Sequence, residues 1–523
     1  MIDVGQKLGQ NEVLLTGANG FLGKVLLGLI LDRYPEFKRL HVLVRPKKDL
    51  SAAERFKTEV LQSPAIEGIA RKRGEDLLQN KISIWPGDVS QPDYGLDPAD
   101  LEKLAGRIGV IINCAGRVEF FPPVDDSFSS NVDGVENLVS LAKRLGSKLV
   151  HVSTCFVCGQ ADGLVEETEP ILGFYPRRKG PEDKSFDHIQ EIRHCRERVR
   201  QIYDSGEATS KGAGKPAGRG RSKEVALRLT ALGKQRAEQW GWVNTYTYSK
   251  SLGEQIIAAE EDLEYAIVRP AIIESALRFP FPGWIEGGRT AAPLVLMALG
   301  GLKDWPVRKD TPLEVVPVDL VASAILVVTA ALLEGRHEPV YQLGTADVNP
   351  IMLDQIATLL CAESRRRPQS GDNRPPALAL IGPPRRVRFL SEEKARVRRE
   401  RLQKRISRVE SVVAGMRKML EGTGLPGRQA VSNWAAALRT LSLQTSFREK
   451  TLEQYLPFML HNRFIFESEN IRAAYSLICE KDRDRVPWEP ERIDWESYWL
   501  GNQIQGIERW VQPEAVREWA FKI

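Results

Sequence analysis

The chain has 523 residues, of which 42% are hydrophobic and 27% are charged. This composition is typical of a folded globular protein and excludes a fibrous or wholly disordered chain, and the length exceeds what one hydrophobic core normally fills. The formal net charge of +5 is too small to indicate a partner, and we expect no nucleic acid.

Short β-branched runs alternate with longer helical patterns through the first 160 residues. Strands that alternate with helices of this length form parallel sheets covered on both faces. We therefore predict an α/β fold, a Rossmann-type doubly wound parallel sheet with a substrate lobe and a mainly helical C-terminal domain. The expected strands are 12–15, 40–44, 82–85, 110–113, 148–153 and 264–269, and the expected helices include 20–32 and 134–145.

The rest of the chain divides by composition. Residues 161–241 form an insertion, and its centre at 205–222 is nearly all Gly, Ser, Lys, Arg and Ala, which predicts a mobile loop. Helical and aromatic patterns return near residue 441. We expect a catalytic domain at 1–365, a Pro-rich and basic connection at 366–440, and a C-terminal domain at 441–523.

Within that connection, the segment 385–408 carries eleven basic residues against three acidic ones. Two interpretations stay open. The segment is either a solvated helix or a surface for anionic lipid headgroups or the phosphates of coenzyme A.

No segment indicates a signal, a membrane span or a metal site. The N-terminus lacks the apolar stretch of a secretory signal, and the longest apolar run, 320–333, is shorter than the roughly 20 residues needed to cross a bilayer. Cys155 and Cys158 have no second pair or nearby histidine to complete a zinc site. We expect a cytoplasmic protein, peripheral to membranes at most, with reduced thiols, no metal and a buried helix at 320–333.

A glycine-rich turn follows the first predicted strand and opens the first helix. Gly17 permits the tight turn, Gly20 lets the backbone approach a pyrophosphate, and Gly23 lets helix and strand pack closely. The N-terminus of the helix offers unpaired N–H groups to the phosphates. The predicted cofactor-binding residues of this turn are Thr16, Gly17, Asn19, Gly20, Phe21, Leu22 and Gly23.

The second strand is followed by Arg45, Lys47 and Lys48, where NAD enzymes usually place an acid. A guanidinium can bind the adenosine 2′-phosphate, so the sequence favours NADPH over a solvated basic loop. Further contacts with the dinucleotide are predicted after the third and fourth strands, at Asp88, Val89, Asn113, Ala115 and Gly116.

Tyr246 and Lys250 are the predicted acid–base pair. Hydride transfer to a carbonyl builds charge on the oxygen and requires a proton donor, and a lysine one helical turn away can stabilise the phenolate. Tyr34 and Lys38 have the same spacing, but they lie at the end of the first helix, and Tyr248 is not the acid.

A hydroxyl at the end of the fifth strand should stabilise the oxyanion. Strand alternation lets only one of Ser153 and Thr154 face the cofactor. We choose Thr154, with Ser153 as a substrate contact or a structural hydrogen bond. His151, in the same strand, is interpreted as a core residue.

These motifs resemble the fatty acyl-CoA reductases, a branch of the extended short-chain dehydrogenases, over most of the chain. The resemblance implies that NADPH reduces a long-chain fatty acyl-CoA to a thiohemiacetal, which releases coenzyme A and leaves a fatty aldehyde. Many members reduce the aldehyde again to a fatty alcohol. The segments that carry the resemblance are 16–23, 152–154, 244–250, 268–275, 281–285, 316–319, 457–464 and 494–498.

The resemblance also implies that Pro270 shapes the nicotinamide pocket and that Phe281, Pro282 and Trp284 line the acyl entrance, although turn and packing roles are equally open for them. The long insertion and the lack of a hydrophobic tail lead us to expect a soluble, bacterial-type member.

Three alternatives stay open: a reductase that releases aldehydes from carrier-protein thioesters, a sugar-nucleotide epimerase or dehydratase, and a non-catalytic nucleotide-binding scaffold. Arg45 counts against an epimerase, which keeps a tightly bound NAD. Tyr246, Lys250 and the nearby hydroxyl count against a scaffold.

Overall fold

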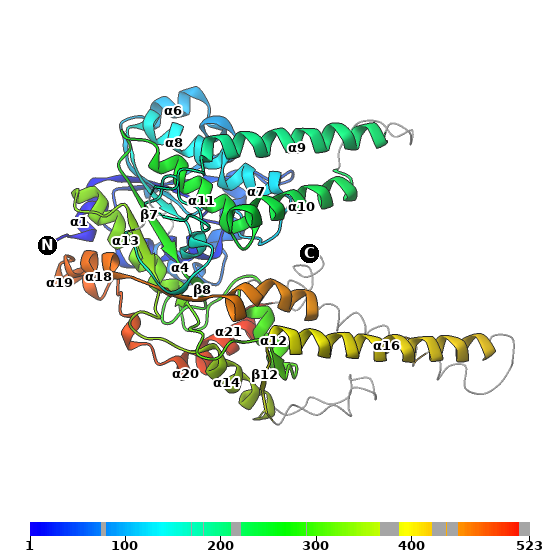
Figure 1. Ribbon diagram of the computed structural model, residues 1–523. Coiled ribbons are helices and arrows are strands. Elements are labelled where there is room, and N and C mark those ends of the chain that lie inside the picture. Colours follow the sequence, from blue (N-terminus) through cyan, green and yellow to red (C-terminus); the bar gives the residue numbers. More distant parts are fainter. Residues whose placement is uncertain are drawn as a thin grey trace.

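The computed structural model describes residues 1–74, 80–168, 170–180, 182–210, 221–288, 290–366, 386–420, 433, 436 and 448–511. Figure 1 shows a layered α/β body from which long helices project on one side.

Seven strands of the described chain form one parallel sheet in the order β11-β7-β5-β4-β1-β2-β3. The six predicted strands are confirmed, and β11 joins them at one edge. Because the chain order reverses between β1 and β4, the carboxyl ends of these strands flank the crevice where such sheets bind ligands. The strands are β1 (Glu12–Thr16), β2 (Arg39–Val44), β3 (Ile82–Pro86), β4 (Ile108–Asn113), β5 (Lys148–Val152), β7 (Tyr265–Pro270) and β11 (Val340–Leu343).

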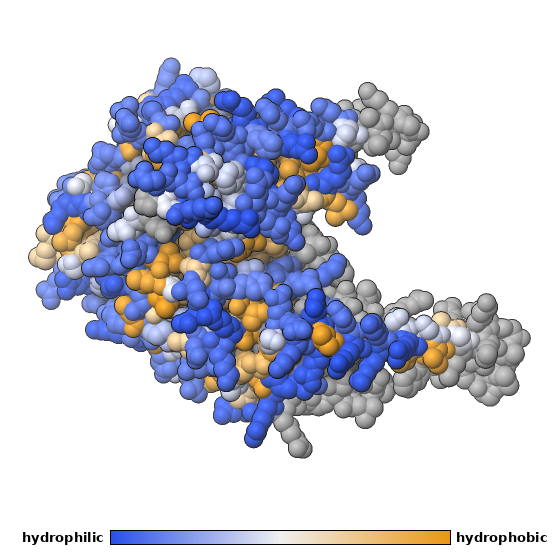
Figure 2. All heavy atoms as spheres, viewed as in Figure 1, coloured by the Kyte–Doolittle hydropathy of each residue, from blue (hydrophilic) through white to orange (hydrophobic). Residues whose placement is uncertain are grey.

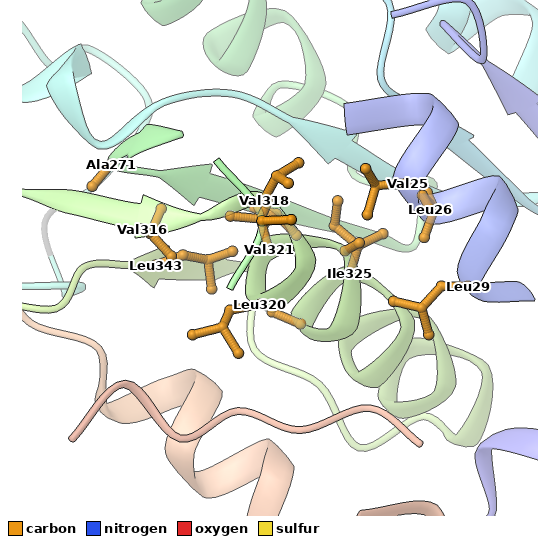
Figure 3. Close-up of a cluster of buried hydrophobic side chains, with 14 of the residues drawn as sticks. Val25, Leu26, Leu29, Ala271, Val316, Val318, Leu320, Val321, Ile325 and Leu343 are labelled. Atoms are coloured by element: carbon orange, nitrogen blue, oxygen red, sulfur yellow. The ribbon is translucent and has the colours of Figure 1, made fainter. Parts of the chain in front are cut away.

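One face of the sheet is covered by α2 (Phe21–Arg33) and α13 (Val318–Glu334). Every residue of α13 from Val318 to Leu332 is buried, which explains why this helix is apolar all round. Figure 3 shows Leu29 of α2 and Ile325 of α13 in this core. The apolar run 320–333 is therefore a core helix, as predicted. Smaller helices of the N-terminal part are α1 (Val4–Gln10), α3 (Ala52–Phe56), the π-helical turn Lys57–Leu61 and α4 (Glu67–Arg73).

The opposite face has its own apolar core, in which Leu14 and Ile111 of the sheet pack with Leu138 of a covering helix. The helices that follow β3 and β4 are α6 (Pro98–Leu104), α7 (Val124–Asn131) and α8 (Asp133–Leu145), and α11 (Thr245–Ala258) packs against α7 and α8.

The insertion contains two helices, α9 (His188–Ser210) and α10 (Lys223–Trp240), which pack against each other and project side by side in Figure 1. Residues 205–210 are helical, so the mobile loop predicted for 205–222 was wrong at that end. A helix that has begun adds each further residue at little cost, which explains the extension through Gly and Ser. Residues 211–220, the centre of that prediction, lie outside the described residues.

The C-terminal part is joined to the catalytic sheet rather than set apart from it. β6 (Asp162–Val165), which follows β5 in the chain, pairs in parallel with β13 (Arg463–Phe466). α18 (Glu469–Ser476) packs on α13 and β11. The predicted domain boundaries near 366 and 441 fall next to or among residues outside the described part, and they stay predictions.

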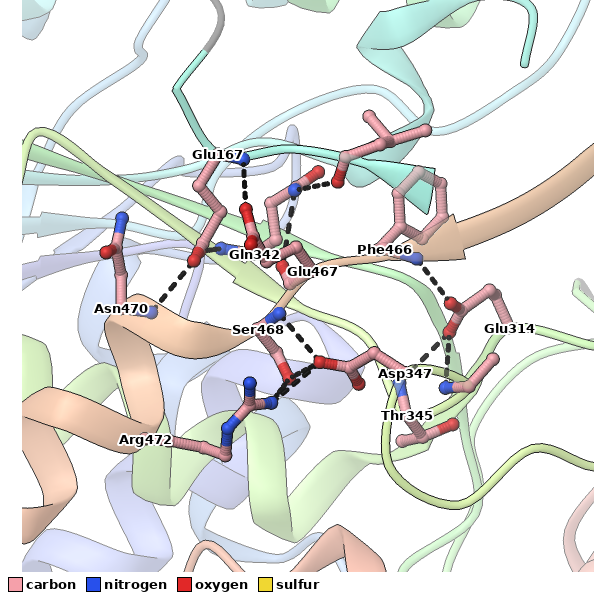
Figure 4. A network of polar contacts seen from close by, with 12 residues as sticks. Glu167, Glu314, Gln342, Thr345, Asp347, Phe466, Glu467, Ser468, Asn470 and Arg472 are labelled. Carbon is pink, nitrogen blue, oxygen red and sulfur yellow. Dashed lines mark hydrogen bonds and ion pairs between the residues drawn. The ribbon is translucent and has the colours of Figure 1, made fainter. Parts of the chain in front are cut away.

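Buried carboxylates bond the two parts together (Figure 4). Glu314 accepts hydrogen bonds from the backbone N of Phe466 at 2.7 Å and of Thr345 at 3.0 Å. Glu167 accepts from the backbone N of Gln342 at 2.6 Å and of Asn470 at 2.8 Å. Burial raises the pKa of both glutamates to about 7.

The other described elements complete the lobe around residues 272–305 and the C-terminal part. They are β8 (Ile272–Glu274), paired with β10 (Val315–Pro317); β9 (Asp304–Trp305), paired with β12 (Arg388–Phe389); and α12 (Ala292–Leu299), α14 (Leu353–Arg366), α16 (Glu392–Leu420), α19 (Glu480–Arg483), α20 (Trp495–Ser497) and α21 (Ile504–Trp510).

α16 contains most of the basic segment 385–408 and extends away from the body in Figure 1. Figure 2 shows largely hydrophilic residues over this projecting helix. Among the described residues, none of the helices combines the length and the apolar character required to span a bilayer.

Candidate active site

The glycine-rich turn lies where β1 ends and α2 begins, at the crevice of the sheet. Gly17 has φ +75°, and a Cβ added there would lie 2.6 Å from the carbonyl carbon of Cys114. A Cβ on Gly23 would collide with the carbonyl oxygen of Gly17. Both positions therefore require glycine for close packing of strand, turn and helix.

The first turn of α2 suits a pyrophosphate. Its N-cap, Gly20, makes no side-chain hydrogen bond, so the first N–H groups of the helix have no capping side chain. Lys24, one turn further, is buried and bonds Glu286 at 2.6 Å. The uncapped N–H groups at this turn could therefore donate hydrogen bonds to a dinucleotide phosphate group.

Basic side chains gather beyond β2, where the adenosine end of a dinucleotide would lie. Arg45 is mostly exposed, and its Nη1 lies 3.6 Å from Oδ2 of Asp88. Arg55, which the sequence did not single out, donates from Nη1 to the Arg45 carbonyl at 2.6 Å. Glu59 binds Lys47, Arg55 and, at 3.1 Å, the amide of Asn19, so one carboxylate holds this group in place.

Of the predicted residues after β3 and β4, Asn113 and Ala115 lie close to the turn. Thr16 donates from Oγ1 to Oδ1 of Asn113 at 2.5 Å, and the backbone N of Ala115 donates to the same oxygen at 3.3 Å. A Cβ on Gly116 would lie 3.8 Å from Nζ of Lys250. The carbonyl of Val89 accepts a hydrogen bond from Nδ2 of Asn137 at 3.1 Å.

Tyr246 and Thr154, the predicted proton donor and hydroxyl, lie together at the end of β5. Tyr246 is in the first turn of α11, which Asn244 caps by accepting from the backbone N of Thr247 at 2.8 Å. Burial raises the pKa of Tyr246 to about 12, and a hydrogen bond with the Thr154 side chain acts in the opposite direction. The phenol therefore carries its proton at neutral pH beside the predicted hydroxyl.

Lys250 does not stabilise a Tyr246 phenolate in the structure as the sequence predicted. Nζ of Lys250 donates to the carbonyl of Val152 at 2.7 Å and lies 3.1 Å from Nε2 of His151. Burial lowers the pKa of Lys250 to about 8, although the nearby Glu254 and Cys114 act to raise it. The lysine is thus held at the end of β5, and the pKa of Tyr246 is raised, where the sequence predicted a phenolate stabilised by an ammonium.

Ser153 and Pro270 are the two other predicted residues at the end of β5 and β7. Thr154 donates from Oγ1 to the carbonyl of Pro270 at 3.4 Å. The hydroxyl of Ser153 is buried, and it has no hydrogen-bond partner among the described residues. An unpaired buried hydroxyl is costly and suits a site that a polar group of a ligand would complete.

The two other tyrosines considered are turned elsewhere. Tyr248 donates to Oε1 of Glu191, on α9, at 2.5 Å. Tyr34 is buried at the end of α2, with the guanidinium of Arg485 over its ring. Neither hydroxyl points to the end of β5.

Phe281, Pro282 and Trp284 lie where the C-terminal helices pack on the lobe. The rings of Phe281 and Trp284 lie 5.6 Å and 5.1 Å from that of Trp510 on α21, and Pro282 is exposed. Among the described residues, no hydrogen bond or ring contact joins this cluster to Thr154 or Tyr246.

A second aromatic group lies beside Tyr246 and Thr154. The carbonyl of Phe120 accepts a hydrogen bond from the backbone N of Tyr246 at 3.3 Å, and its ring stacks on that of Phe458 with the ring centroids 5.6 Å apart. Phe156, two residues after Thr154, packs edge-on against Phe458 at 5.1 Å. The matched segment 457–464 was the one sequence signal for this group, but its position beside Tyr246 depends on tertiary packing.

Comparisons with known proteins identify the family of this chain. The model of the male sterility protein family matches residues 15–325. Fatty acyl-CoA reductase 1 of Arabidopsis thaliana is 27% identical, over 96% of this chain and 97% of the plant protein. The alcohol-forming fatty acyl-CoA reductase of Simmondsia chinensis is 28% identical, over 71% of this chain and 73% of that protein.

The fold also resembles a solved structure, the reductase domain of a non-ribosomal peptide synthetase from Mycobacterium tuberculosis. The TM-score is 0.50 at 19% identity, over 97% of this chain and 95% of that chain. Together with the family match over more than half of the chain, these findings identify an oxidoreductase with a nicotinamide-dinucleotide-binding fold. The chain belongs to the fatty acyl-CoA reductase family.

Proposed function

We propose that this protein uses NADPH to reduce long-chain fatty acyl-CoA to fatty aldehyde and then to fatty alcohol, with release of coenzyme A. The main support is one arrangement. Thr154, Tyr246 and Lys250 meet at the carboxyl edge of the sheet, beside a glycine turn that fits a pyrophosphate and an aromatic group that can contact an acyl chain.

Each of these residues has a chemical task in the proposal. NADPH supplies the hydride to the thioester carbonyl. Tyr246 donates its proton to the oxygen, and the hydroxyl of Thr154 donates a hydrogen bond to the same oxygen. The resulting thiohemiacetal expels coenzyme A as a thiol and leaves the aldehyde, which a second hydride and a second proton convert to the alcohol.

Purified protein, palmitoyl-CoA and NADPH test this function directly. We expect loss of nicotinamide absorbance, release of free thiol, and two NADPH consumed for each thioester. One NADPH per thioester would limit the product to aldehyde. No NADPH oxidation with long-chain thioesters on coenzyme A would refute the proposal, and activity only with carrier-protein thioesters would replace its substrate.

The preference for NADPH depends on the basic group beyond β2. Arg45→Glu should weaken NADPH binding by about 10- to 100-fold, because a charge-assisted bond to the 2′-phosphate becomes a repulsion, while NADH binding changes little. Titration of the nicotinamide fluorescence with both dinucleotides measures this. An equal effect on NADPH and NADH would contradict the assigned role of Arg45.

For the acyl chain, we propose contacts with Phe120 and Phe458, with Phe281, Pro282 and Trp284 farther along the entrance. Phe458→Ala should raise KM for palmitoyl-CoA several-fold and leave KM for a short-chain thioester unchanged, because each buried methylene of the chain contributes about 0.8 kcal/mol. Steady-state kinetics with acyl chains of graded length check this result. A uniform loss at all chain lengths would point to misplacement of Tyr246 instead.

We further propose that α16 contacts anionic headgroups when the enzyme meets membrane-borne substrate. Its exposed basic side chains are Lys394, Arg396, Arg398, Arg401, Lys404, Arg405 and Arg408. Co-sedimentation with phosphatidylserine vesicles, but not with phosphatidylcholine vesicles, is the expected result at low salt, and it should weaken as salt rises. Replacement of Arg401, Lys404 and Arg405 by glutamine should reduce it; unchanged sedimentation would refute a role for α16.

A further inference from the structure

A row of polar side chains crosses three strands of the sheet and ends on Lys250. In the strand register, Thr16 of β1 lies opposite Asn113 of β4, and Asn113 lies opposite His151 of β5. Thr16 donates to Asn113 Oδ1 at 2.5 Å, Nδ2 of Asn113 lies 3.0 Å from His151 Nδ1, and Nε2 of His151 lies 3.1 Å from Nζ of Lys250. Thr16, Asn113, His151 and Lys250 are all buried, so the row is shielded from solvent.

The direction of the hydrogen bonds in this row follows from one backbone group. The backbone N of Ala115 can only donate, and it donates to Oδ1 of Asn113. Nδ2 of Asn113 is therefore the atom that faces His151, and it too can only donate. His151 must accept at Nδ1, and as a neutral imidazole it carries its proton on Nε2, the atom that faces Lys250.

That proton has an acceptor only if Lys250 is a neutral amine. An ammonium has no lone pair, so a charged Lys250 would place two donors against each other either at His151 Nε2 or, with the other tautomer, at Nδ1. His41 of β2 shows the contrast. Its Nδ1 accepts from Trp85 Nε1 at 2.9 Å, and its Nε2 lies 2.8 Å from a carboxylate oxygen of Glu12, so every donor there has an acceptor.

The charged and titratable groups around Lys250 are also consistent with a neutral amine at this position. Glu254, one turn further on α11, is bonded by Arg269 of β7, with Arg269 Nε 3.0 Å from Oε1, so its charge is already paired. Burial raises the pKa of the Cys114 thiol, which follows β4, to about 12, and it stays neutral. Burial, and then the proximity of Lys250, lower the pKa of His151 well below its ordinary value. Tyr246, one turn earlier on α11, is protonated at neutral pH.

We propose that the row Thr16–Asn113–His151 stabilises the neutral amine of Lys250, and that binding of an anionic dinucleotide at this edge makes Lys250 take up one proton. His151 is then a positioning residue, which sets the charge of Lys250 without contact with the substrate. The proposal rests on the proposed nicotinamide function of this edge. The phosphates of the dinucleotide favour the ammonium, and the ammonium is the form that can stabilise a phenolate at Tyr246. Above about pH 8, where unbound Lys250 is mostly neutral, binding of the cofactor would thus also charge the catalytic pair.

Binding of NADPH to the full chain in the absence of acyl thioester tests this coupling between pH 7 and 9.5. The 2′-phosphate, whose second pKa is about 6, does not titrate in this range. With the pKa of Lys250 near 8 before binding and higher after it, the affinity should be constant below about pH 7.5 and fall by about tenfold per pH unit above pH 8. Calorimetry in two buffers of different ionisation enthalpy should show uptake of about one proton at pH 9.

Two nearly isosteric variants separate this role from a merely structural one. His151→Gln keeps one acceptor for Asn113 and one donor for Lys250, and it should retain the fall in affinity above pH 8. His151→Glu offers acceptors to both neighbours and should bind NADPH with an affinity that is flat up to pH 9.5. An equally steep fall in both variants would overturn the proposal, as would the absence of proton uptake in the unaltered chain, a measurement that requires no variant to fold.

The same titration distinguishes this inference from the proposed function. Failure to bind either NADPH or NADH at every pH would refute the nicotinamide assignment and this inference with it. Tight binding that does not change with pH would refute only the proton uptake.

Discussion

Replacement of Tyr246 by phenylalanine should lower kcat by about 10²- to 10⁴-fold and leave the Kd for NADPH nearly unchanged. The reason is that, in the proposed reaction, the hydroxyl hydrogen-bonded with the Thr154 side chain donates the proton as hydride reaches the carbonyl. The ring stays in place because Asn244 caps the helix and the Phe120 carbonyl accepts from the backbone N of Tyr246. Single-turnover oxidation of bound NADPH, followed by its fluorescence, measures the chemical step directly.

Tyr248→Phe is the matched control for this experiment. It removes a hydroxyl from the same helix two residues away, but that hydroxyl donates to Glu191, on α9. We expect turnover close to that of the unaltered protein and a loss of stability of about 1.5–3 kcal/mol, the contribution of a hydrogen bond to a charged group. Equal losses of turnover in the two variants would show that disturbance of α11, and not loss of the proton donor, explains the effect of Tyr246→Phe.

The parts of the fold that depend on local pattern could be predicted from the sequence. Strands buried on both faces are continuous apolar runs, and a glycine turn between a strand and a helix has few other uses. The helical end of α9 was missed because Gly and Ser at 205–210 indicate a loop locally, while the helix they extend is held by packing against α10. β13 was missed for a related reason, because its partner β6 is 300 residues away in the chain.

For the site, residue types were predictable and their partners were not. The spacing of Tyr246 and Lys250 indicates one helix face, but it does not show that Lys250 bonds the carbonyl of Val152 and contacts His151. His151 was interpreted as a core residue, and it is buried and bonded at both ring nitrogens. Its link to Asn113 follows from the register of β4 with β5, and its link to Lys250 from the packing of α11 at the end of β5. A pattern within one segment contains no information about such a register.

A buried ion pair connects the catalytic helix to the sheet and leads to the second large effect. Glu254 of α11 and Arg269 of β7 have side chains only 2% and 10% exposed, and their closest approach is 2.5 Å. Glu254→Leu should destabilise the protein by about 3–5 kcal/mol, because it leaves the guanidinium of Arg269 buried without its carboxylate. The midpoint of urea unfolding, followed by tryptophan fluorescence at fixed pH, should fall accordingly.

The double variant Glu254→Leu/Arg269→Met decides between two reasons for that loss. If the cost is the unpaired charge, removal of both charges should recover most of the stability, since apolar residues of similar volume can replace a buried pair. If the double variant is as unstable as the single one, the pair instead provides specific bonds that position α11 on β7.

Measurement of turnover in the two variants separates these cases further. Arg269 immediately precedes Pro270, whose carbonyl accepts from Thr154, so a shift of α11 against β7 would move Tyr246 relative to the hydroxyl it meets. Recovery of stability without recovery of turnover would therefore show that the ion pair serves the geometry of the site more than the stability of the fold.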